Sequence, residues 1–140
     1  MAIDVLICDD SAVMRNMVKR ALNMTGLAIG NVDFANHGDD AIEKVSGRSY
    51  DLLLLDVNMP VRDGVSALTE IRRAEEGHGI SVVAVTSEGS DEKRQALRDL
   101  RASIVSKPFT AEQLVDGILD AIRNPYGMAE TPQRAVLTSF

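Results

Sequence analysis

Short apolar runs alternate along this chain with longer segments in which apolar residues recur at helical spacing. Short runs rich in leucine or β-branched residues predict strands, and the helical spacing predicts helices with one buried face. We expect strands at Ile3–Cys8, Val32–Ala35, Leu52–Asp56, Ile80–Val85 and Ala102–Val105. We expect helices at Ala12–Asn23, Asp39–Val45, Val65–Ala74, Asp91–Leu100 and from Thr110 to a stop at Pro125.

The order of these elements predicts the fold class. Strand and helix alternate from one end of the chain to the other, which indicates an α/β fold: a doubly wound parallel sheet with helices on both faces. Leu52–Asp56 and Ile80–Val85 are continuously apolar, as is typical of parallel strands buried on both sides. In such sheets the ligand site lies at the carboxyl ends of the strands.

The helix starts and one helix face carry further expectations. Ser90 is placed to cap Asp91–Leu100, and Thr110 with Gln113 has the spacing of a capping box. Gly26 is placed to end the first helix in a left-handed conformation. The first helix is expected to bury one apolar face, made of Val13, Met14, Met17, Val18, Ala21 and Leu22.

Length and charge restrict the function. The 140 residues suggest one domain, residues 1–124, followed by an aperiodic tail, 125–140. A net charge of −6 argues against binding to nucleic acid or to an anionic membrane surface. The single cysteine, Cys8, lies in the first apolar run and is expected to be a buried structural residue. The chain lacks a signal-peptide pattern and a membrane-spanning run, so we expect a cytoplasmic location.

Polar residues with distinct chemistry stand where the predicted strands end. Asp9 and Asp10 follow the first strand, Asp56 ends the third, Thr86 follows the fourth and Lys107 follows the fifth. Each of these residues alone could be a cap or a turn residue. Together they would converge at one edge of a parallel sheet, and that arrangement points to a ligand.

The chemistry of this group suggests metal-assisted phosphoryl transfer. Clustered carboxylates repel one another, and a hard cation such as Mg²⁺ relieves the repulsion through all-oxygen coordination. A carboxylate can also act as a nucleophile and form an acyl phosphate. Lys107 and the hydroxyl of Thr86 could then neutralise charge on the phosphoryl oxygens.

The chain closely resembles the response-regulator receiver domain of two-component signalling, over about residues 2–123. The motifs that carry the resemblance are Asp9-Asp10-Ser11, Leu55-Asp56-Val57-Asn58-Met59-Pro60, Asp63-Gly64, Val85-Thr86-Ser87 and Lys107-Pro108-Phe109. The resemblance implies a flavodoxin-like sheet with strand order 2-1-3-4-5. It implies that Asp56 accepts a phosphoryl group from the phosphohistidine of a sensor histidine kinase or a histidine phosphotransfer protein.

The resemblance also implies how the site is assembled. Mg²⁺ would be held by Asp10, Asp56 and the backbone carbonyl of Asn58, with Asp9 acting mainly through water. Lys107, before a cis Pro108, would pair with the phosphoryl group. On activation Thr86 would move toward that group.

Flanking positions place the chain near the chemotaxis-type, CheY-like receivers. Asn58 and Glu88 stand where family members tune the access of water to the acyl phosphate. Ile104 stands where the family often has an aromatic switch ring, and the turn at Leu100-Arg101 lacks the usual glycine. A stand-alone receiver of this kind would act by binding a target, such as a flagellar motor switch, through its fourth helix, fifth strand and fifth helix.

Several alternatives remain open at this point. A single-domain phosphorelay intermediate or phosphate sink would use the same site. A haloacid-dehalogenase-like phosphatase would need an Asp-x-Asp motif after the first strand, whereas this chain has Cys8-Asp9-Asp10-Ser11. A flavodoxin-like cofactor binder would need a phosphate-cradling loop at that place. We expect no enzymatic activity beyond the chain's own phosphoryl transfer and dephosphorylation.

Overall fold

The computed structural model describes residues 2–59, 62–87 and 90–123, and the structural findings concern these residues. Five parallel strands form one sheet in the order β2-β1-β3-β4-β5. Their bounds are β1 Ile3–Cys8, β2 Ile29–Ala35, β3 Leu52–Asp56, β4 Ser81–Thr86 and β5 Ala102–Ser106. The doubly wound parallel sheet and the strand order 2-1-3-4-5 are therefore confirmed.

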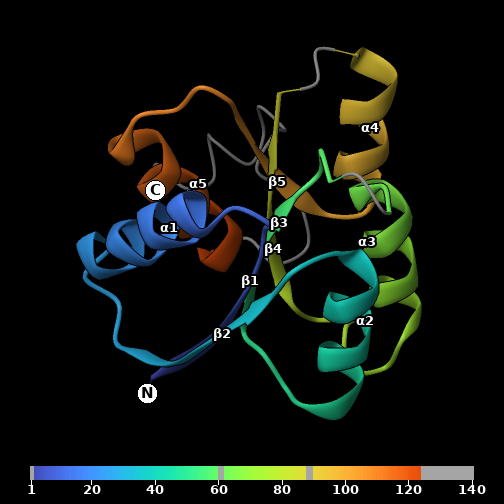
Figure 1. The fold of residues 1–140 in the computed structure, drawn as a ribbon, viewed down its shortest axis with the longest axis horizontal. Helices are drawn as coiled ribbons and strands as arrows, with labels where there is room; N and C mark the ends of the chain where they lie inside the picture. Colours follow the sequence, from blue (N-terminus) through green and yellow to red (C-terminus); the bar gives the residue numbers. More distant parts are fainter. Residues whose placement is uncertain (1, 60–61, 88–89, 124–140) are drawn as a thin grey trace, which may run out of the picture.

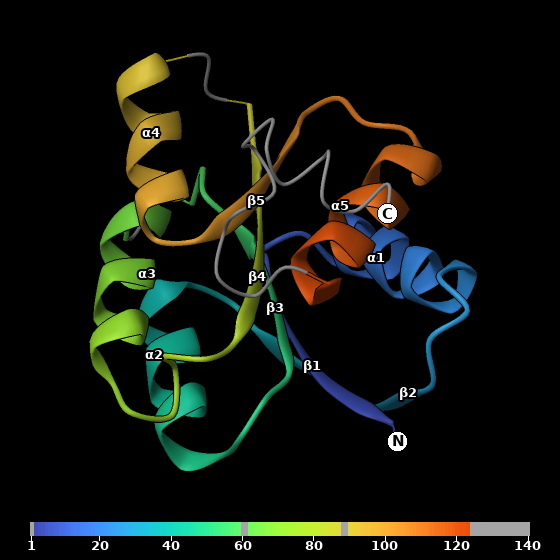
Figure 2. The same ribbon diagram turned by 180° about the vertical axis from the view of Figure 1, so that it is seen from behind.

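Helices cover both faces of this sheet (Figures 1 and 2). On one face α1 lies against α5, and on the other face α2, α3 and α4 lie in sequence. The helix bounds are α1 Ala12–Met24, α2 Gly38–Gly47, α3 Gly64–Arg73, α4 Asp91–Asp99 and α5 Ala111–Arg123. None of the helices in the described ranges is long and apolar enough to cross a bilayer.

The side chains of the strands divide between two cores. On β1, Leu6 and Cys8 enter the core beneath α2, α3 and α4, whereas Val5 and Ile7 enter the core beneath α1 and α5. β3 divides in the same way, because successive side chains of a strand point to opposite faces. β3 and β4 are buried on both sides, and this explains their continuous apolar sequence.

The predicted helix caps are present. The Ser90 hydroxyl accepts a hydrogen bond from the Lys93 amide at 3.2 Å. The Thr110 hydroxyl accepts from the Gln113 amide at 3.1 Å, and the Gln113 side chain accepts from the Thr110 amide at 2.9 Å, which completes the capping box. Gly26 has a φ of 80° and follows α1, as expected.

The starts of β2 and α2 differ from the expectation. β2 begins at Ile29, before the expected Val32, because edge pairing with β1 extends the strand through polar residues. α2 begins one residue before Asp39, after an N-cap formed by His37, whose Nδ1 accepts from the Asp40 amide. Histidine is an uncommon cap, and the sequence pattern missed it.

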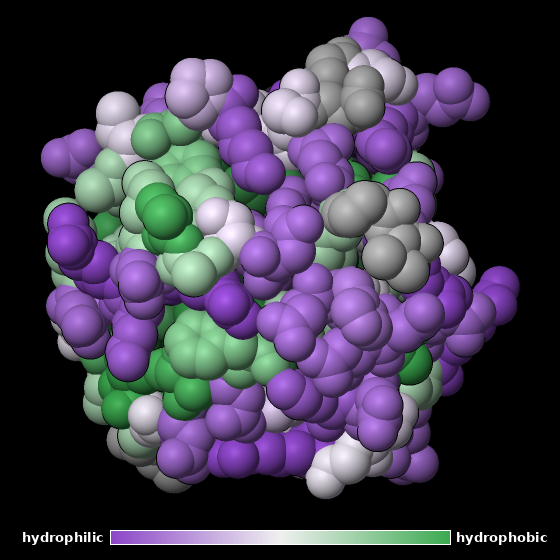
Figure 3. Space-filling model, in the orientation of Figure 1, coloured by the Kyte–Doolittle hydropathy of each residue, from purple (hydrophilic) through white to green (hydrophobic). Residues whose placement is uncertain are grey.

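The buried face of α1 is narrower than predicted. Val18, Ala21 and Leu22 are buried, but Val13 is 71% exposed and Met17 is also exposed. Figure 3 shows apolar surface on the side of the molecule formed by α1 and α5. The expected six-residue buried face of α1 was therefore wrong for Val13 and Met17.

The buried side chain of Arg72 stabilises the turn between α4 and β5. Arg101 has a φ of 64°, so it takes the left-handed conformation that the missing glycine would have favoured. The guanidinium of Arg72, at the end of α3, donates to the carbonyls of Leu100 and Arg101 in this turn. It also donates to carbonyls of the loop before β4, those of Gly77, His78 and Ile80.

Candidate functional site

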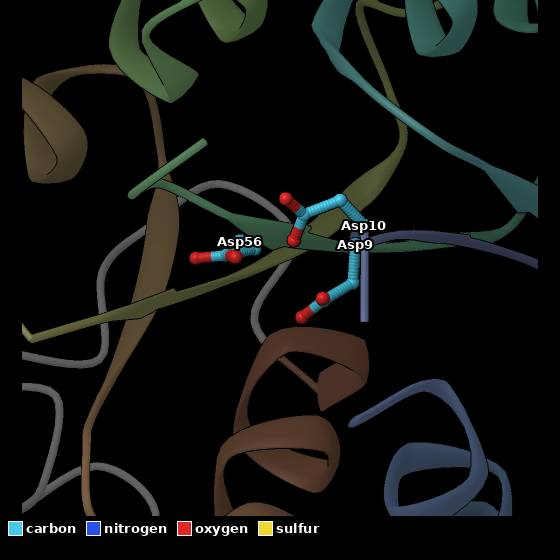
Figure 4. A group of neighbouring side chains, drawn as sticks. All are labelled: Asp9, Asp10 and Asp56. Carbon is cyan, nitrogen blue, oxygen red and sulfur yellow. The ribbon is translucent and has the colours of Figure 1, made fainter. Parts of the chain in front are cut away.

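The carboxyl ends of neighbouring strands bring together the side chains that the sequence analysis selected. Asp9 follows β1 directly, Asp56 is the last residue of β3, Thr86 is the last residue of β4, and Lys107 follows β5. Figure 4 shows Asp9, Asp10 and Asp56 as neighbours at the ends of β1 and β3. The topology of the sheet therefore forms the site from segments that are distant in the sequence.

Asp9, Asp10 and Asp56 form an acidic cluster. One carboxylate oxygen from each lies within 4.8 Å of the others, and Asp9 and Asp56 are buried. Burial raises the pKa of the Asp9 carboxyl, and the negative charge of Asp56 raises it further, while a hydrogen bond from the Ser11 amide at 2.7 Å acts in the opposite direction. Clustered carboxylate oxygens are the donors that a hard divalent cation prefers, so the residues present fit such an ion.

Lys107 supplies the positive charge of the site. Its Nζ lies 3.0 Å from Oδ1 of Asp56. The Lys107 amide donates to the Thr86 carbonyl at 2.8 Å, which fixes the start of the loop after β5 against the end of β4. The peptide bond between Lys107 and Pro108 is cis, as expected.

Asn58 contacts both the acidic and the hydroxyl part of the site. Its amide donates to Oδ1 of Asp56 at 3.0 Å. Its side-chain oxygen Oδ1 lies 3.3 Å from the Thr86 hydroxyl, 2.7 Å from the Ser87 amide and 3.1 Å from the Ser87 hydroxyl. The sequence analysis selected Asn58 as a tuning residue and a backbone ligand, but it did not foresee this side-chain network, and Ser87 was not selected.

Of the other positions selected for tuning or switching, the structure describes Ile104 but not Glu88. Ile104 is half-buried and packs against the core beneath α2, α3 and α4. The position of the family's aromatic ring is thus filled by an aliphatic side chain with no polar group to report a change of state. Glu88, the second expected tuning residue, lies outside the described residues, as does the expected tail, 125–140.

The fold and the site together define a doubly wound α/β protein with an acidic, metal-competent site at the carboxyl edge of its sheet. Residues 5–119 match the model of the response regulator receiver domain, and the chain belongs to this family, the receiver domains of two-component systems. The alternatives of a haloacid-dehalogenase-like phosphatase and a flavodoxin-like cofactor binder receive no support from this match.

Individual relatives agree with this assignment. The chain is 32% identical to the chemotaxis protein CheY of Halobacterium salinarum over 123 residues, which cover 87% of this chain and 98% of that protein. CheY of Bacillus subtilis is 33% identical over 84% of this chain and 96% of its own length. A protein-glutamate methylesterase of Archaeoglobus fulgidus is 37% identical, but the match spans 31% of that protein.

Solved structures give the same result. The chemotaxis response regulator CheY4 of Vibrio cholerae superposes with a TM-score of 0.75 at 30% identity, covering 86% of this chain and 99% of CheY4. The receiver domain of a sensor histidine kinase from Pseudomonas aeruginosa, with a magnesium ion coordinated in its active-site cleft, has a TM-score of 0.72 at 25% identity. That match covers 88% of this chain and 99% of the receiver domain.

Proposed function

We propose that this chain is a phosphorylation-dependent signalling switch in which Asp56 accepts a phosphoryl group from the phosphohistidine of a sensor histidine kinase or a histidine phosphotransfer protein. The observation that carries the proposal is the environment of Asp56. Its carboxylate is 5% exposed, contacts Lys107 at 3.0 Å and belongs to the acidic cluster with Asp9 and Asp10. Asp56 thus combines a nucleophilic oxygen with an adjacent cation and a place for a metal.

The reaction exchanges one bond to phosphorus for another. A carboxylate oxygen of Asp56 forms a bond to phosphorus while the phosphorus–nitrogen bond of the donor breaks. The leaving imidazole keeps the electron pair and takes up a proton. Lys107 offsets negative charge on the phosphoryl oxygens, and the hydroxyl of Thr86 donates to one of them. Later attack of water on phosphorus breaks the acyl phosphate into inorganic phosphate, a proton and the free Asp56 carboxylate.

We propose Mg²⁺ as the cofactor, held by Asp10, Asp56 and the backbone carbonyl of Asn58, with Asp9 acting through water. The all-oxygen donor set of the acidic cluster supports this assignment, as does the magnesium ion in the receiver from Pseudomonas aeruginosa. When bound, the ion neutralises charge on the transferring phosphoryl group.

A chemotaxis role is the form of this function that the relatives favour. The match to the CheY proteins spans nearly their full length, and these proteins are named for chemotaxis. The phosphorylated chain would bind a downstream target, such as a flagellar motor switch, through α4, β5 and α5. It would work in the cytoplasm, and its only chemistry would be its own phosphorylation and dephosphorylation. A phosphorelay intermediate or phosphate sink is the alternative, and it would bind only phosphodonor proteins.

Labelling with acetyl phosphate tests the proposed site. We expect Mg²⁺-dependent formation of one acyl phosphate, detected by intact mass and removed by hydroxylamine. Asp56→Asn should abolish the label, whereas Asp33→Asn, which changes a β2 carboxylate that contacts Arg48 and Tyr50 outside the acidic cluster, should keep it. Full labelling of Asp56→Asn would contradict the assignment, and enzyme-like turnover of p-nitrophenyl phosphate would revive the phosphatase alternative.

A pull-down separates the two signalling roles. The phosphorylated chain and the Asp56→Asn variant are compared as baits in a lysate that contains both motor-switch and phosphotransfer proteins. Phosphorylation-dependent capture of a motor-switch protein supports the chemotaxis role. Capture of kinases and phosphotransfer proteins without any motor-switch protein supports the relay or sink.

A further inference from the structure

The side chain of Asn58 spans the gap between the loop after β3 and the loop after β4. Its Oδ1 accepts from the Ser87 amide at 2.7 Å and from the Ser87 hydroxyl at 3.1 Å, and it lies within hydrogen-bond distance of the Thr86 hydroxyl at 3.3 Å. A backbone amide can only donate, so the atom that faces Ser87 must be the carbonyl oxygen of the Asn58 side chain. We call these contacts of Asn58 with Thr86 and Ser87 the Asn58 bridge.

The Asn58 bridge starts at the residue that also contacts the proposed phosphoacceptor. The Asn58 amide donates to Oδ1 of Asp56 at 3.0 Å, and the same oxygen accepts from Lys107. Asn58 therefore connects Asp56 at the end of β3 to Thr86 and Ser87 at the end of β4. A change in the charge or bonding of Asp56 can therefore reach Thr86 and Ser87 through Asn58.

The hydroxyl of Thr86 can donate a hydrogen bond to only one acceptor at a time. A hydroxyl carries one proton and can donate it to one acceptor. Thr86 is fully buried, so donation to a phosphoryl oxygen on Asp56 and donation to Asn58 are alternatives within the site. Three donors also converge on an oxygen that has two lone pairs, and the Thr86 contact is the longest of the three.

We propose that Asn58 is a positioning residue whose side-chain oxygen holds Thr86 and the start of the β4–α4 loop in the resting arrangement. This inference rests on the proposed function. A phosphoryl oxygen forms stronger, charge-assisted hydrogen bonds than an amide oxygen does, so phosphorylation of Asp56 withdraws the Thr86 hydroxyl from Asn58. The Ser87 amide and hydroxyl then remain as two donors for the two lone pairs of the Asn58 oxygen.

The Asn58 bridge would also explain how this chain signals with Ile104 in place of an aromatic ring. Ile104 packs into the core with an aliphatic side chain and has no hydrogen bond to exchange. The exchange of acceptors at Thr86 needs no ring. The equilibrium between the resting and the active arrangement then depends on two competing acceptors of the Thr86 hydroxyl proton, the Asn58 oxygen and a phosphoryl oxygen.

Binding of beryllium fluoride, a stable phosphoryl mimic, tests this inference without interference from hydrolysis. Asn58→Ala keeps the backbone carbonyl and amide but removes the competing acceptor. We expect its affinity for beryllium fluoride with Mg²⁺, measured by calorimetry, to rise about two- to fivefold. In a Thr86→Val background the same Asn58→Ala change should give no gain, because no hydroxyl proton remains to be contested. A purely structural role of Asn58 would give equal changes in both backgrounds.

Ser87→Ala is the matched control. It removes the Ser87 hydroxyl but keeps the amide contact of 2.7 Å and the Thr86 contact, so we expect a change in affinity smaller than that of Asn58→Ala. Equal or weaker binding by folded Asn58→Ala than by the wild type would overturn the inference.

Amide exchange of Ser87, followed by NMR, gives a second readout on the wild-type protein. We expect slow exchange in the resting state and slower exchange with beryllium fluoride, because two donors in place of three then share the Asn58 oxygen. Equal or faster exchange would overturn the inference even if Asn58→Ala failed to fold. The proposed function fails separately: a wild-type chain that does not bind beryllium fluoride with Mg²⁺ would remove both. Wild-type binding with no Asn58 effect would remove the bridge alone.

Discussion

The Nζ of Lys107 lies 3.0 Å from Oδ1 of Asp56, and this ion pair joins the loop after β5 to the end of β3. The Asp56 side chain is 5% exposed and that of Lys107 is 26% exposed, so water screens the pair only in part. Two further carboxylates stand beside Asp56. Lys107 is therefore a cation that offsets their repulsion before any ligand binds.

Replacing Lys107 by alanine should impair both stability and phosphorylation. Without Mg²⁺ the buried carboxylate of Asp56 loses its counter-charge, and we expect the free energy of unfolding to fall by about 1–3 kcal/mol. The rate of labelling by acetyl phosphate should fall by about 100-fold, because charge on the phosphoryl oxygens is no longer offset. Urea unfolding and intact mass against time measure the two effects.

Lys93→Ala is the control for this prediction. The Lys93 side chain is 27% exposed and lies 3.7 Å from Asp63, so the substitution removes an equally exposed lysine from an ion pair outside the acidic cluster. We expect the labelling rate to stay within about twofold of the wild type. A comparable loss of rate in both variants would mean that Lys107 acts through general charge and not through the site.

Removing the charge of Asp9 should raise the stability of the metal-free protein and weaken its response to Mg²⁺. Asp9→Asn keeps an oxygen that can accept from the Ser11 amide but removes the repulsion with Asp10 and Asp56. We expect it to raise the metal-free free energy of unfolding by at least about 1 kcal/mol. It should also reduce the rise in melting temperature that Mg²⁺ produces, and EDTA should abolish that rise in the wild type.

The exposed Glu43 of α2 provides the comparison for Asp9. Glu43→Gln makes the same change of net charge away from the cluster, so its stability and Mg²⁺ response should match the wild type. A gain equal to that of Asp9→Asn would indicate an effect of net charge alone, and a full Mg²⁺ response in Asp9→Asn would contradict a role for Asp9 around the metal.

Much of the site could be predicted from the sequence because parallel strands bring their carboxyl ends to one edge. Asp9, Asp56, Thr86 and Lys107 follow apolar runs, and the alternation of strands and helices was enough to place them together. The capping residues Ser90 and Thr110 were predictable for a similar reason, because their hydrogen bonds are local in the sequence.

Contacts between distant polar side chains could not be predicted in this way. The Asn58 bridge depends on how two loops approach each other, and nothing in the spacing of Asn58 and Ser87 reports that approach. The spacing of six apolar positions predicted helix α1 but not the width of its buried face. α5 covers only part of that face and leaves Val13 exposed. Nothing in the sequence around Arg72, a charged residue near a helix end, indicates that it is buried.

Arg72 should be among the most important polar residues for stability. It is 7% exposed, and its guanidinium donates to the backbone carbonyls of Gly77, His78, Ile80, Leu100 and Arg101. Burial lowers its pKa to about 10, and the nearby charge of Arg101 adds to this effect, so it remains protonated at neutral pH. We expect Arg72→Met to lower the free energy of unfolding by about 3 kcal/mol or more, because buried carbonyls lose their donors.

Arg73 offers a matched comparison for Arg72 on the same helix. Its side chain is 74% exposed and lies 3.6 Å from Glu70. Arg73→Met should change the free energy of unfolding by no more than about 0.5 kcal/mol in urea titrations. Similar losses for the two variants would contradict the structural role of Arg72.

Cys8 should make stability depend on pH in the alkaline range. Burial raises the pKa of its thiol to about 12, and the charges of Asp9 and Asp56 contribute, whereas the unfolded chain has the ordinary value of 9.0. The folded thiol holds its proton at pH values where the unfolded thiol loses it. The contribution of Cys8 to the free energy of unfolding is therefore constant below about pH 8 and falls as the pH rises from about 9 toward 12. The slope from this group is at most about 1.4 kcal/mol per pH unit, and it should be absent in Cys8→Ala.

Urea unfolding of both proteins between pH 8 and pH 10 measures the difference. Parallel pH profiles would contradict it, as would rapid alkylation of Cys8 in the native protein at pH 8.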